Sequence, residues 1–350
     1  MERRSPDMIS RTTPFHNPRA TLIAALLLVS CCVLPVSAVT VTDDAGTHVT
    51  LNATPQRIVS LAPSNTEILA ALGLTGRLVG ITDACNYPPE VNTVPRIGGY
   101  SAISTEKVSA ARPDLVIASD ITPAETTARL RALGLTVVVV APRNIDDMIR
   151  DIRLVGALTG TDAEADRLAW NLSSRLADVG PVQPAGTRPT IAHVVWNNPL
   201  YVSGNDTLQN DVIEHAGGTN AFFRVSGWGT VSLEEFLMTN PDIIIVNGGG
   251  GMDNKTRDVI LEDFMTRPQY ASLSAVKNHH VYAVKTDTIS RAGPRIVDAT
   301  EQVAADVREM TQTGKGEPAG VAPTARTPGF CAAGTVLFIA ASVFLVQRRR

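Results

Sequence analysis

Short runs of β-branched and aliphatic residues alternate with amphipathic segments through the middle of the chain. The runs RIVSLA, RLVGIT, DLVIAS and TVVVVAP have the composition of strands. The segments SNTEILAALG and ARLRALG, which lie between them, space their apolar residues as a helix does and end at a glycine. This alternation predicts an α/β fold in which mainly parallel sheets are flanked by helices.

An internal repeat divides this part of the chain into two lobes. Residues 103–118, ISTEKVSAARPDLVIA, align without gaps with residues 231–246, VSLEEFLMTNPDIIIV. Each copy has a serine, a glutamate two residues later, a helical run, and then Pro-Asp before an apolar strand. The proline ends each helix because it disfavours helical backbone in the residue before it. We therefore expect two related lobes, residues 55–142 and 188–310, after a short lead-in at residues 39–54.

Residues 143–187, which connect the lobes, carry apolar residues at helical spacing. We expect Gly160 to end the first half of this connector and Asp162 to cap the second half. A helical connector is stiffer than the crossover strands that join the lobes of widely hinging binding proteins. The sequence therefore predicts two lobes joined by a long rigid helix, with little motion of one lobe against the other.

Residues 1–38 have the pattern of an export signal. Four arginines precede the continuous apolar run ATLIAALLLVSCCVLPVSA, which ends in the small-x-small sequence of Val36, Ser37 and Ala38. We expect cleavage after Ala38. A weaker alternative is lipid attachment at Cys31 in the sequence LVSC, because that cysteine lies well inside the apolar run.

The C-terminal residues predict attachment to a membrane. A linker rich in Pro, Gly, Thr and Ala at residues 311–327 precedes a tail at residues 328–350, whose apolar stretch stops at three arginines. The sequence TPGF resembles the sorting signal of archaeal surface proteins of the PGF type. That resemblance implies that the tail is removed and replaced by a lipid. With or without the lipid, we expect the protein at the extracellular face of the cell membrane.

The charge balance excludes one class of partner. The chain has 31 basic and 34 acidic residues, and removing the signal (four basic, two acidic) and the tail (three basic) leaves 24 and 32, a net charge of −8. An acidic domain without a basic stripe is a poor binder of nucleic acid.

Catalytic and metal-binding patterns are missing from the sequence. It contains no Gly-x-Ser-x-Gly, no Walker loop and no His-Glu-x-x-His, and its six histidines are scattered without ligand spacing. The glycines at residues 248–251 predict a flexible loop. Cys85, the one cysteine outside the two end segments, is interpreted as a small buried thiol rather than a nucleophile. We predict neither a catalytic residue nor a metal site.

Several of the few large aromatic residues fall in loops that follow predicted strands. They are Tyr87, Tyr100, Trp196 and Trp228. In α/β sheets the loops after the carboxyl ends of strands line the ligand crevice. Rings presented there by both lobes suit a large, flat, partly apolar ligand. The alternative for any one ring is that it only fills its own loop.

The loop KTDTISRAGPRI offers charged groups at the edge of the same crevice. It holds Asp287, Arg291 and Arg295 before the last helix. The alternative interpretation is an ordinary helix start with solvated arginines.

Two glutamates in the second copy of the repeat have separate roles. Ser232 and Glu235 fit a capping box, which gives Glu235 a structural function. Glu234 is left pointing outward, and Glu106 occupies the equivalent position in the first lobe. Two matched acids on two lobes fit basic groups of a two-fold partner. The alternative is the general preference for acids in the first turn of a helix.

Several segments together resemble the substrate-binding proteins of cobalamin ABC importers, within the helix-linked class that also carries siderophores and haem. They are RIVSLAPSNTEILAALGL, VGITDACNYPPEV, RPDLVIAS, SGNDTLQNDVIEHAGGTN and SRAGPRI. The resemblance implies that Tyr100, Trp196 and Trp228 pack on a corrinoid, with Asp287 and Arg291 at its edge. It also implies that Glu106 and Glu234 dock on arginines of two permease subunits. The sequence departs from the family at Ala84 and Tyr100, where other aromatic residues are familiar.

We therefore expect a monomeric, membrane-attached protein that binds cobalamin or a related corrinoid without a cofactor of its own. It delivers this ligand to the permease dimer and ATPase subunits of an ABC importer and catalyses no reaction. The alternatives are a carrier of ferric siderophore or haem and, more distantly, a chelatase-like or hydrolytic enzyme on a two-lobed α/β frame.

Overall fold

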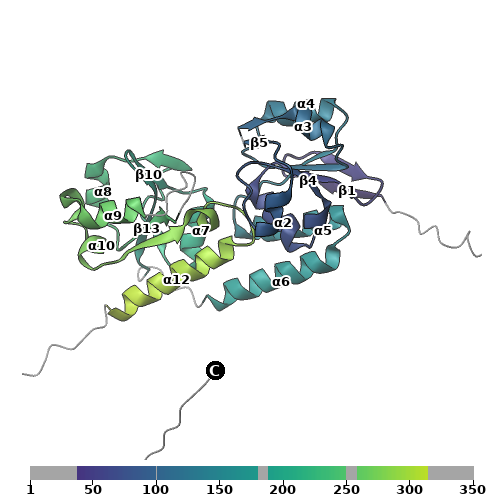
Figure 1. Cartoon of the computed structure of the whole chain (residues 1–350). Coiled ribbons are helices and arrows are strands. Elements are labelled where there is room, and N and C mark those ends of the chain that lie inside the picture. The colour runs from purple at the N-terminus through teal and green to yellow at the C-terminus, as the bar shows by residue number, and fades with distance from the viewer. Residues whose placement is uncertain (1–37, 100, 180–187, 250–257, 314–350) are drawn as a thin grey trace, which may run out of the picture.

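The computed structural model describes residues 38–99, 101–179, 188–249 and 258–313, which form two α/β lobes (Figure 1). The C-terminal tail, and the export signal up to residue 37, lie outside these residues. No helix in the described ranges is both long enough and apolar enough to cross a membrane. The two-lobed α/β fold predicted from the sequence is confirmed.

The first lobe is built on a four-stranded sheet in which all pairings are parallel. Its elements are β1 (Val39–Thr42), β2 (His48–Leu51), β3 (Ile58–Ser60), α2 (Pro63–Ala71), η1 (Thr75–Arg77), β4 (Leu78–Ile81), η2 (Pro89–Thr93), β5 (Gly98–Gly99), β6 (Ala102–Ile103), α3 (Thr105–Ala110), β7 (Leu115–Ala118), α4 (Ala124–Ala132) and β8 (Val137–Val139). The order in the sheet is β4-β3-β7-β8, and the two central strands are fully buried. The lead-in at residues 39–54 forms a hairpin of β1 and β2 that belongs to this lobe.

The second lobe has a six-stranded mixed sheet. Its elements are β9 (Thr190–Asn197), β10 (Leu200–Ser203), α7 (Leu208–His215), β11 (Thr219–Asn220), β12 (Trp228–Thr230), α8 (Leu233–Thr239), β13 (Ile243–Gly248), α9 (Val259–Thr266), η3 (Pro268–Tyr270), α10 (Ser274–Lys277), β14 (Val281–Lys285), α11 (Thr286–Ile289) and α12 (Ile296–Thr313). The order is β12-β10-β9-β13-β14, with β11 beside β9. β9, β13, β14 and β11 pair in parallel, whereas β10 pairs antiparallel with both of its neighbours.

The connector consists of two helices, α5 (Ile145–Thr159) and α6 (Asp162–Asp178), where the sequence predicted a long rigid helix made of two halves. Gly160 ends α5 in the left-handed region at φ 68°, as predicted. Thr161, and not Asp162, stands at the N-cap of α6. The two helices pack closely at the turn, because a side chain on Gly156 would stand 2.4 Å from the Cβ of Ala165.

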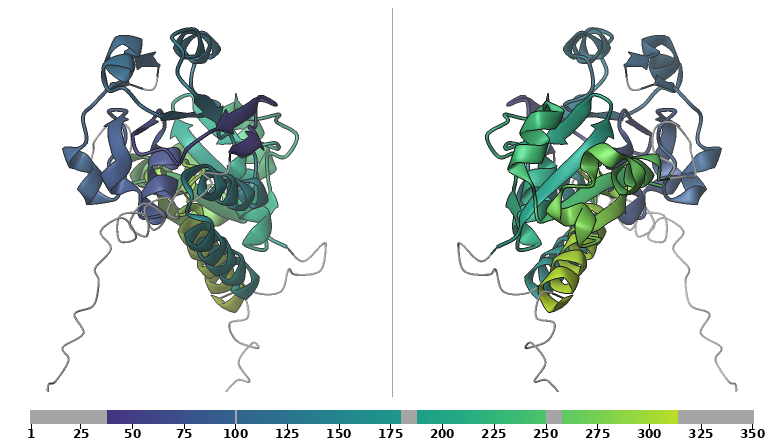
Figure 2. Two further views of the ribbon diagram at one scale, coloured as in Figure 1. Left: turned by 90° about the vertical axis from the view of Figure 1, so that its right-hand side faces the viewer. Right: turned by 90° about the vertical axis from the view of Figure 1, so that its left-hand side faces the viewer.

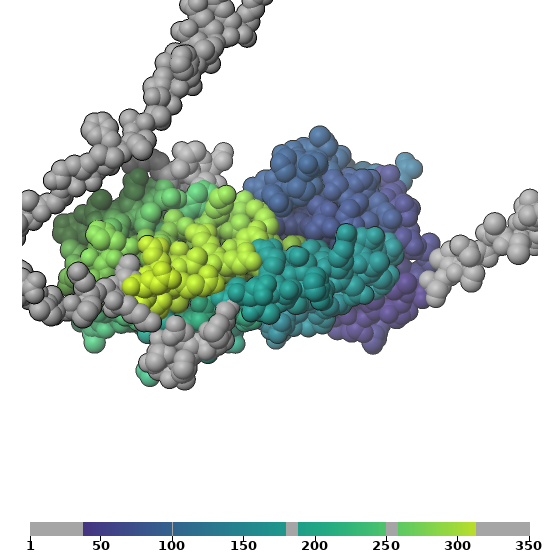
Figure 3. Space-filling view, turned by 90° about the horizontal axis from the view of Figure 1, so that it is seen from below, coloured from purple at the N-terminus to yellow at the C-terminus, as the bar shows by residue number. Residues whose placement is uncertain are grey.

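The C-terminal end of α6 lies beside the N-terminal part of α12 on one face of the molecule (Figures 2 and 3). The guanidinium of Arg175 on α6 binds the carboxylates of Asp298 and Glu301 on α12 at 2.6 Å each. Since α5 packs against β1 and α2 of the first lobe, these contacts join the connector to both lobes.

The internal repeat is visible in the structure. Ser104 and Ser232 are the N-caps of α3 and α8, and each hydroxyl accepts a hydrogen bond from the backbone N–H three residues later. Asp114 and Asp242, which follow the two helices, accept backbone N–H groups at the start of β3 and β9 respectively. The equivalent side chains therefore perform the same local task in both lobes. Of the predicted capping box, the bond to Ser232 Oγ is the half seen in the structure.

α7 of the second lobe is tied to the first helix of the connector. Asp211 Oδ2 accepts a hydrogen bond from the backbone N–H of Ile145, the first residue of α5, at 2.7 Å. His215 Nδ1 lies 3.3 Å from the other oxygen of the same carboxylate. The hydrogen bond to Asp211 raises the pKa of His215 to about 9. A protonated His215 therefore supports the carboxylate that holds the two elements together.

We predict that His215→Gln destabilises the protein at low pH and not at high pH. The pKa of His215 is raised on folding, so its contribution is complete below the unfolded value of 6.5 and is lost as pH rises through about 9. Because 34% of the His215 side chain is exposed, screening reduces the loss to about 1 kcal/mol, or roughly 2–4 °C in melting temperature. Thermal unfolding at pH 6 and pH 10 checks this, with Glu214→Gln on the same helix as the control. Equal losses at both pH values would contradict the pairing.

Candidate ligand-binding site

A cavity of about 700 Å³ lies between the lobes. In the first lobe it is lined by residues that follow the carboxyl ends of β3, β7 and β8, where an α/β sheet presents its ligand crevice. The start of α5 forms one wall. The lining residues are Asp44, Ser64, Ser119, Asp120, Ile121, Ala141, Pro142, Arg143, Asp147, Arg150, Asp206, Leu208, Gln209, Trp228, Ser290, Arg291 and Ala292.

Trp228 lines this cavity from the start of β12, where the sequence predicted a loop that follows a strand. The side chain is 49% exposed at the start of β12. The two flanking glycines allow this placement for different reasons. Gly227 has φ 66°, which favours glycine, and a side chain on Gly229 would stand 2.8 Å from Val225 Cγ1. The loop therefore presents a large ring to the space between the lobes.

The other predicted aromatic residues lie elsewhere. Trp196 ends β9 with 48% of its side chain exposed, and its indole N–H donates to Asn198 O at 2.8 Å. Tyr87 lies under the guanidinium of Arg295, whose Cζ is 4.0 Å from the ring centroid. Neither residue lines the cavity, and Tyr100 is outside the described residues. Of the three rings that are described, the structure brings that of Trp228 to the cavity, and the ligand contacts of all four stay predictions.

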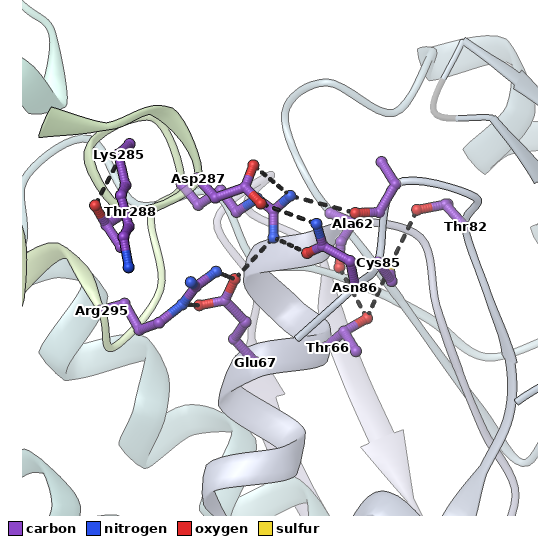
Figure 4. Close-up of polar contacts among 12 residues, drawn as sticks. Ala62, Thr66, Glu67, Thr82, Cys85, Asn86, Lys285, Asp287, Thr288 and Arg295 are labelled. Atoms are coloured by element: carbon purple, nitrogen blue, oxygen red, sulfur yellow. Dashed lines mark hydrogen bonds and ion pairs between the residues drawn. The ribbon is translucent and has the colours of Figure 1, made fainter. Parts of the chain in front are cut away.

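The predicted polar residues Asp287 and Arg291 belong to a network that crosses between the lobes (Figure 4). The Glu67 network consists of Glu67, Asn86, Asp287, Arg291 and Arg295. Arg295 Nε and Nη2 donate to the two oxygens of Glu67 at 2.9 and 2.6 Å. Arg291 Nη1 donates to Glu67 Oε1 at 3.1 Å and to Asn86 Oδ1 at 2.8 Å.

Asp287 links two other members of the Glu67 network, Arg291 and Asn86. Its carboxylate binds Arg291 Nη2 at 2.7 Å and accepts a hydrogen bond from Asn86 Nδ2 at 2.9 Å. The Arg291 and Asp287 side chains of the second lobe therefore meet a loop of the first lobe directly.

Glu67, the acid at the centre of this network, is not among the site residues predicted from the sequence. It is the only charged residue in the sequence of α2, and 2% of its side chain is exposed. An acid within an otherwise uncharged helix needs a partner if it is buried, and that is the signal the sequence contains. Its partners lie more than 200 residues away, so no local pattern names them.

The wall formed by α5 carries a second group of charges. Arg150 binds Asp147 at 2.6 Å, and Asp44 and Asp151 at 3.0 Å each. Asp151 is fully buried. Burial and the nearby Asp44 carboxylate raise the pKa of Asp151 to about 7. The charge of Arg150 is thus balanced by three acids, although 54% of its side chain is exposed.

A triad-like group in the second lobe is closed to substrate. His193 Nδ1 lies 3.1 Å from Ser203 Oγ, and His193 Nε2 lies 3.0 Å from Asn247 Oδ1. Burial lowers the pKa of His193 to about 4, so the ring is neutral. His193 and Ser203 have no exposed surface, which indicates a core polar group rather than a nucleophile and its base.

The described residues contain no group of three or more His, Cys, Asp and Glu side chains arranged for a metal ion. Cys85 is buried, as predicted, and its sulfur lies 3.1 Å from Thr66 Oγ1 and 3.2 Å from Thr82 Oγ1.

Glu106 and Glu234 lie exposed in the first turns of α3 and α8, at equivalent positions of the two lobes. Both helices lie away from α6 and α12 in Figure 1. Beside Glu234, Met238 has 80% of its side chain exposed, the most among the large apolar residues of the described ranges. Its equivalent in α3 is Ala110.

The chain is similar in sequence to known binding proteins. A family model described as periplasmic binding protein matches residues 58–288. The chain is 30% identical over 277 residues to the uncharacterized ABC transporter substrate-binding lipoprotein YvrC of Bacillus subtilis, covering 77% of this chain and 85% of the relative. It is also 30% identical over 251 residues to the vitamin B12-binding protein of Vibrio cholerae, covering 71% and 87% respectively.

Solved structures agree with these relatives. The periplasmic vitamin B12 binding protein BtuF of Vibrio cholerae superposes with a TM-score of 0.66 at 27% identity, covering 74% of this chain and 98% of that one. The periplasmic heme-binding protein RhuT from Roseiflexus sp. RS-1 gives a TM-score of 0.64 at 25% identity, covering 73% and 99%. The arrangement of two α/β lobes is thus shared with proteins named for different ligands.

Proposed function

Because the chain belongs to the periplasmic binding protein family, we propose that it is the substrate-binding protein of an ABC importer and that it captures cobalamin or a related corrinoid between its lobes. The observation that carries this proposal is the composition of the cavity wall. It combines a half-exposed tryptophan with aliphatic and neutral polar side chains, and two of its three described arginines, Arg150 and Arg291, are bound by acids.

A corrinoid is a large ring with neutral amide groups around its edge. Ile121, Leu208 and Trp228 offer apolar contact for such a ring, and Ser119, Gln209 and Ser290 offer hydrogen bonds for the amides. The cargo is a ligand to be transported, as in the relatives named for the vitamin they bind, and the proposal includes no cofactor.

Haem fits the described cavity wall less well. Haem iron is held in proteins by His, Cys, Met or Tyr, and none of these residue types is among the described residues that line the cavity. A ferric siderophore, which is commonly anionic, would need free basic groups. Two of the three arginines among the described lining residues are bound by acids: Arg291 by Glu67 and Asp287, and Arg150 by its three acids. The third, Arg143, shares the lining with the acids Asp120 and Asp206. These pairings favour a neutral ring over an anionic chelate.

Delivery to the permease is assigned to the acids Glu106 and Glu234. They are exposed, equivalent in the two lobes, and separate from the cavity lining. Acids at such positions steer a partner that carries basic residues and set its orientation. We place the protein as a monomer at the extracellular face of the membrane. The export signal and the C-terminal tail support this location from the sequence, and the relatives are a lipoprotein and periplasmic proteins by name.

Titration of a soluble fragment, residues 39–313, with cyanocobalamin tests the ligand. We expect saturable binding at micromolar concentration or below, followed by quenching of tryptophan fluorescence and by calorimetry. Haem and a ferric siderophore are the competing ligands in the same assay. Tight binding of either one, with no binding of cyanocobalamin or cobinamide, would overturn the corrinoid assignment.

Trp228→Ala should weaken corrinoid binding by about 1–3 kcal/mol, because truncation of an aromatic ring at the centre of a binding surface costs this much. The fall in affinity corresponds to roughly 5- to 150-fold in Kd. Trp170→Ala is the matched control, since Trp170 on α6 is 70% exposed and lies outside the cavity lining. A Trp228 variant with unchanged affinity would show that the ring does not contact the ligand.

Glu106→Gln combined with Glu234→Gln should leave corrinoid affinity unchanged and abolish uptake by the reconstituted importer. Affinity should not change because both carboxylates lie outside the cavity lining. Uptake should be lost because each lobe loses the acid proposed to bind the permease. Glu125→Gln together with Glu164→Gln, two exposed acids on α4 and α6, is the control for a general loss of charge. Uptake at the rate of the unchanged protein would rule out docking through these acids.

A further inference from the structure

One carboxylate of the first lobe binds two arginines of the second. Glu67 comes from α2, whereas Arg291 and Arg295 come from the loop between α11 and α12 and its junction with α12. Only 2% of the Glu67 side chain is exposed, against 13% for Arg291 and 18% for Arg295. The three charged groups are therefore mostly out of contact with water. In this environment their attraction is strong, and salt screens it weakly.

The two arginines bind Glu67 in different ways. Arg295 uses two donors on the two carboxylate oxygens, the parallel geometry that fixes both distance and orientation. Its guanidinium is also held against the Tyr87 ring of the first lobe. Arg291 uses one donor to Glu67 and shares its remaining donors among Asn86, Ala84 O and Asp287.

Arg291 also lines the cavity, which Arg295 and Glu67 do not. The same side chain therefore forms part of the ligand site and part of the contact between the lobes. Moving the lobes apart would remove Glu67 and Asn86 from Arg291 and leave a guanidinium and a carboxylate poorly compensated, which is costly for groups this deeply buried.

We propose that Glu67 is the positioning residue of the cleft. Its carboxylate holds Arg295 as a fixed link between the lobes, sets their separation, and keeps the Arg291 guanidinium in the cavity wall. The ligand then meets a preformed site and spends little binding energy on closing it. This inference deepens the proposed function, on which it rests for its effect on ligand, but its effect on the lobes is independent of which ligand binds.

Pulsed EPR on the ligand-free protein tests the link. Spin labels introduced at Ser109→Cys on α3 and Met238→Cys on α8 report the separation of the lobes, and the native Cys85 is buried. We expect one narrow distance distribution in the parent protein and a broader one, shifted to longer distance, in Glu67→Gln. Arg295→Lys, which keeps the charge but loses the paired geometry, should give a smaller broadening and carries the test if Glu67→Gln does not fold.

Gly80→Ala separates this role from a general loss of stability. A side chain there would stand 2.8 Å from Ile97 Cγ2 within the first lobe, so the variant should melt earlier with an unchanged distance distribution. A folded Glu67→Gln or Arg295→Lys protein whose distribution matches that of the parent would overturn the inference.

Ligand titration completes the test. If loss of the Glu67 carboxylate leaves about a tenth of the molecules with the binding-competent separation, the apparent Kd of Glu67→Gln rises roughly tenfold, and bound ligand narrows the distribution again. If no corrinoid binds the parent protein, the proposed function fails, while the distance distributions still decide the role of Glu67.

Discussion

The contact of the Glu67 carboxylate with Arg291 and Arg295 is the constraint on which the cleft depends. Each lobe has its own sheet and a buried apolar cluster of its own, and a third buried apolar cluster runs from the first lobe through the connector into the second. Apolar contact in this shared cluster holds the lobes together, and the paired hydrogen bonds of Arg295 to Glu67 add a contact that fixes both distance and orientation. The helix pair α6 and α12 adds a second junction, in which Arg175 again binds two acids across the boundary. Removing one partner of the buried Glu67 contact costs about 3–5 kcal/mol, whereas the Arg175 contacts are more exposed.

The fold could be predicted from the sequence wherever the information is local. Apolar runs locate the strands, and the positions of Ser104 and Ser232 before helical segments give both N-caps. Gly160 ends α5 as expected, because left-handed backbone favours glycine. The packing of the two halves of the connector against each other depends on the close approach of Gly156 to Ala165, a tertiary contact that helical periodicity does not encode.

Less of the site could be predicted, because the sequence does not show in which direction a loop side chain points. A loop after a strand reaches the ligand edge of the sheet, but the backbone of that loop decides where its side chain points. The glycines beside Trp228 were a visible signal, and this ring does line the cavity. Tyr87 occupies a comparable loop, yet its ring lies against Arg295. Arg291 was identified by its motif, but its main partner could not be, since Glu67 precedes it by 224 residues.

The repeat has a consequence for symmetry. The two copies place Glu106 and Glu234 equivalently, but the residue four positions later is Ala110 in one and the exposed Met238 in the other. A partner made of two identical halves therefore receives a carboxylate on each half and a thioether side chain on one half only. Association with such a partner breaks its two-fold symmetry. Each half becomes distinguishable from the other for as long as the complex lasts, although their sequences are the same.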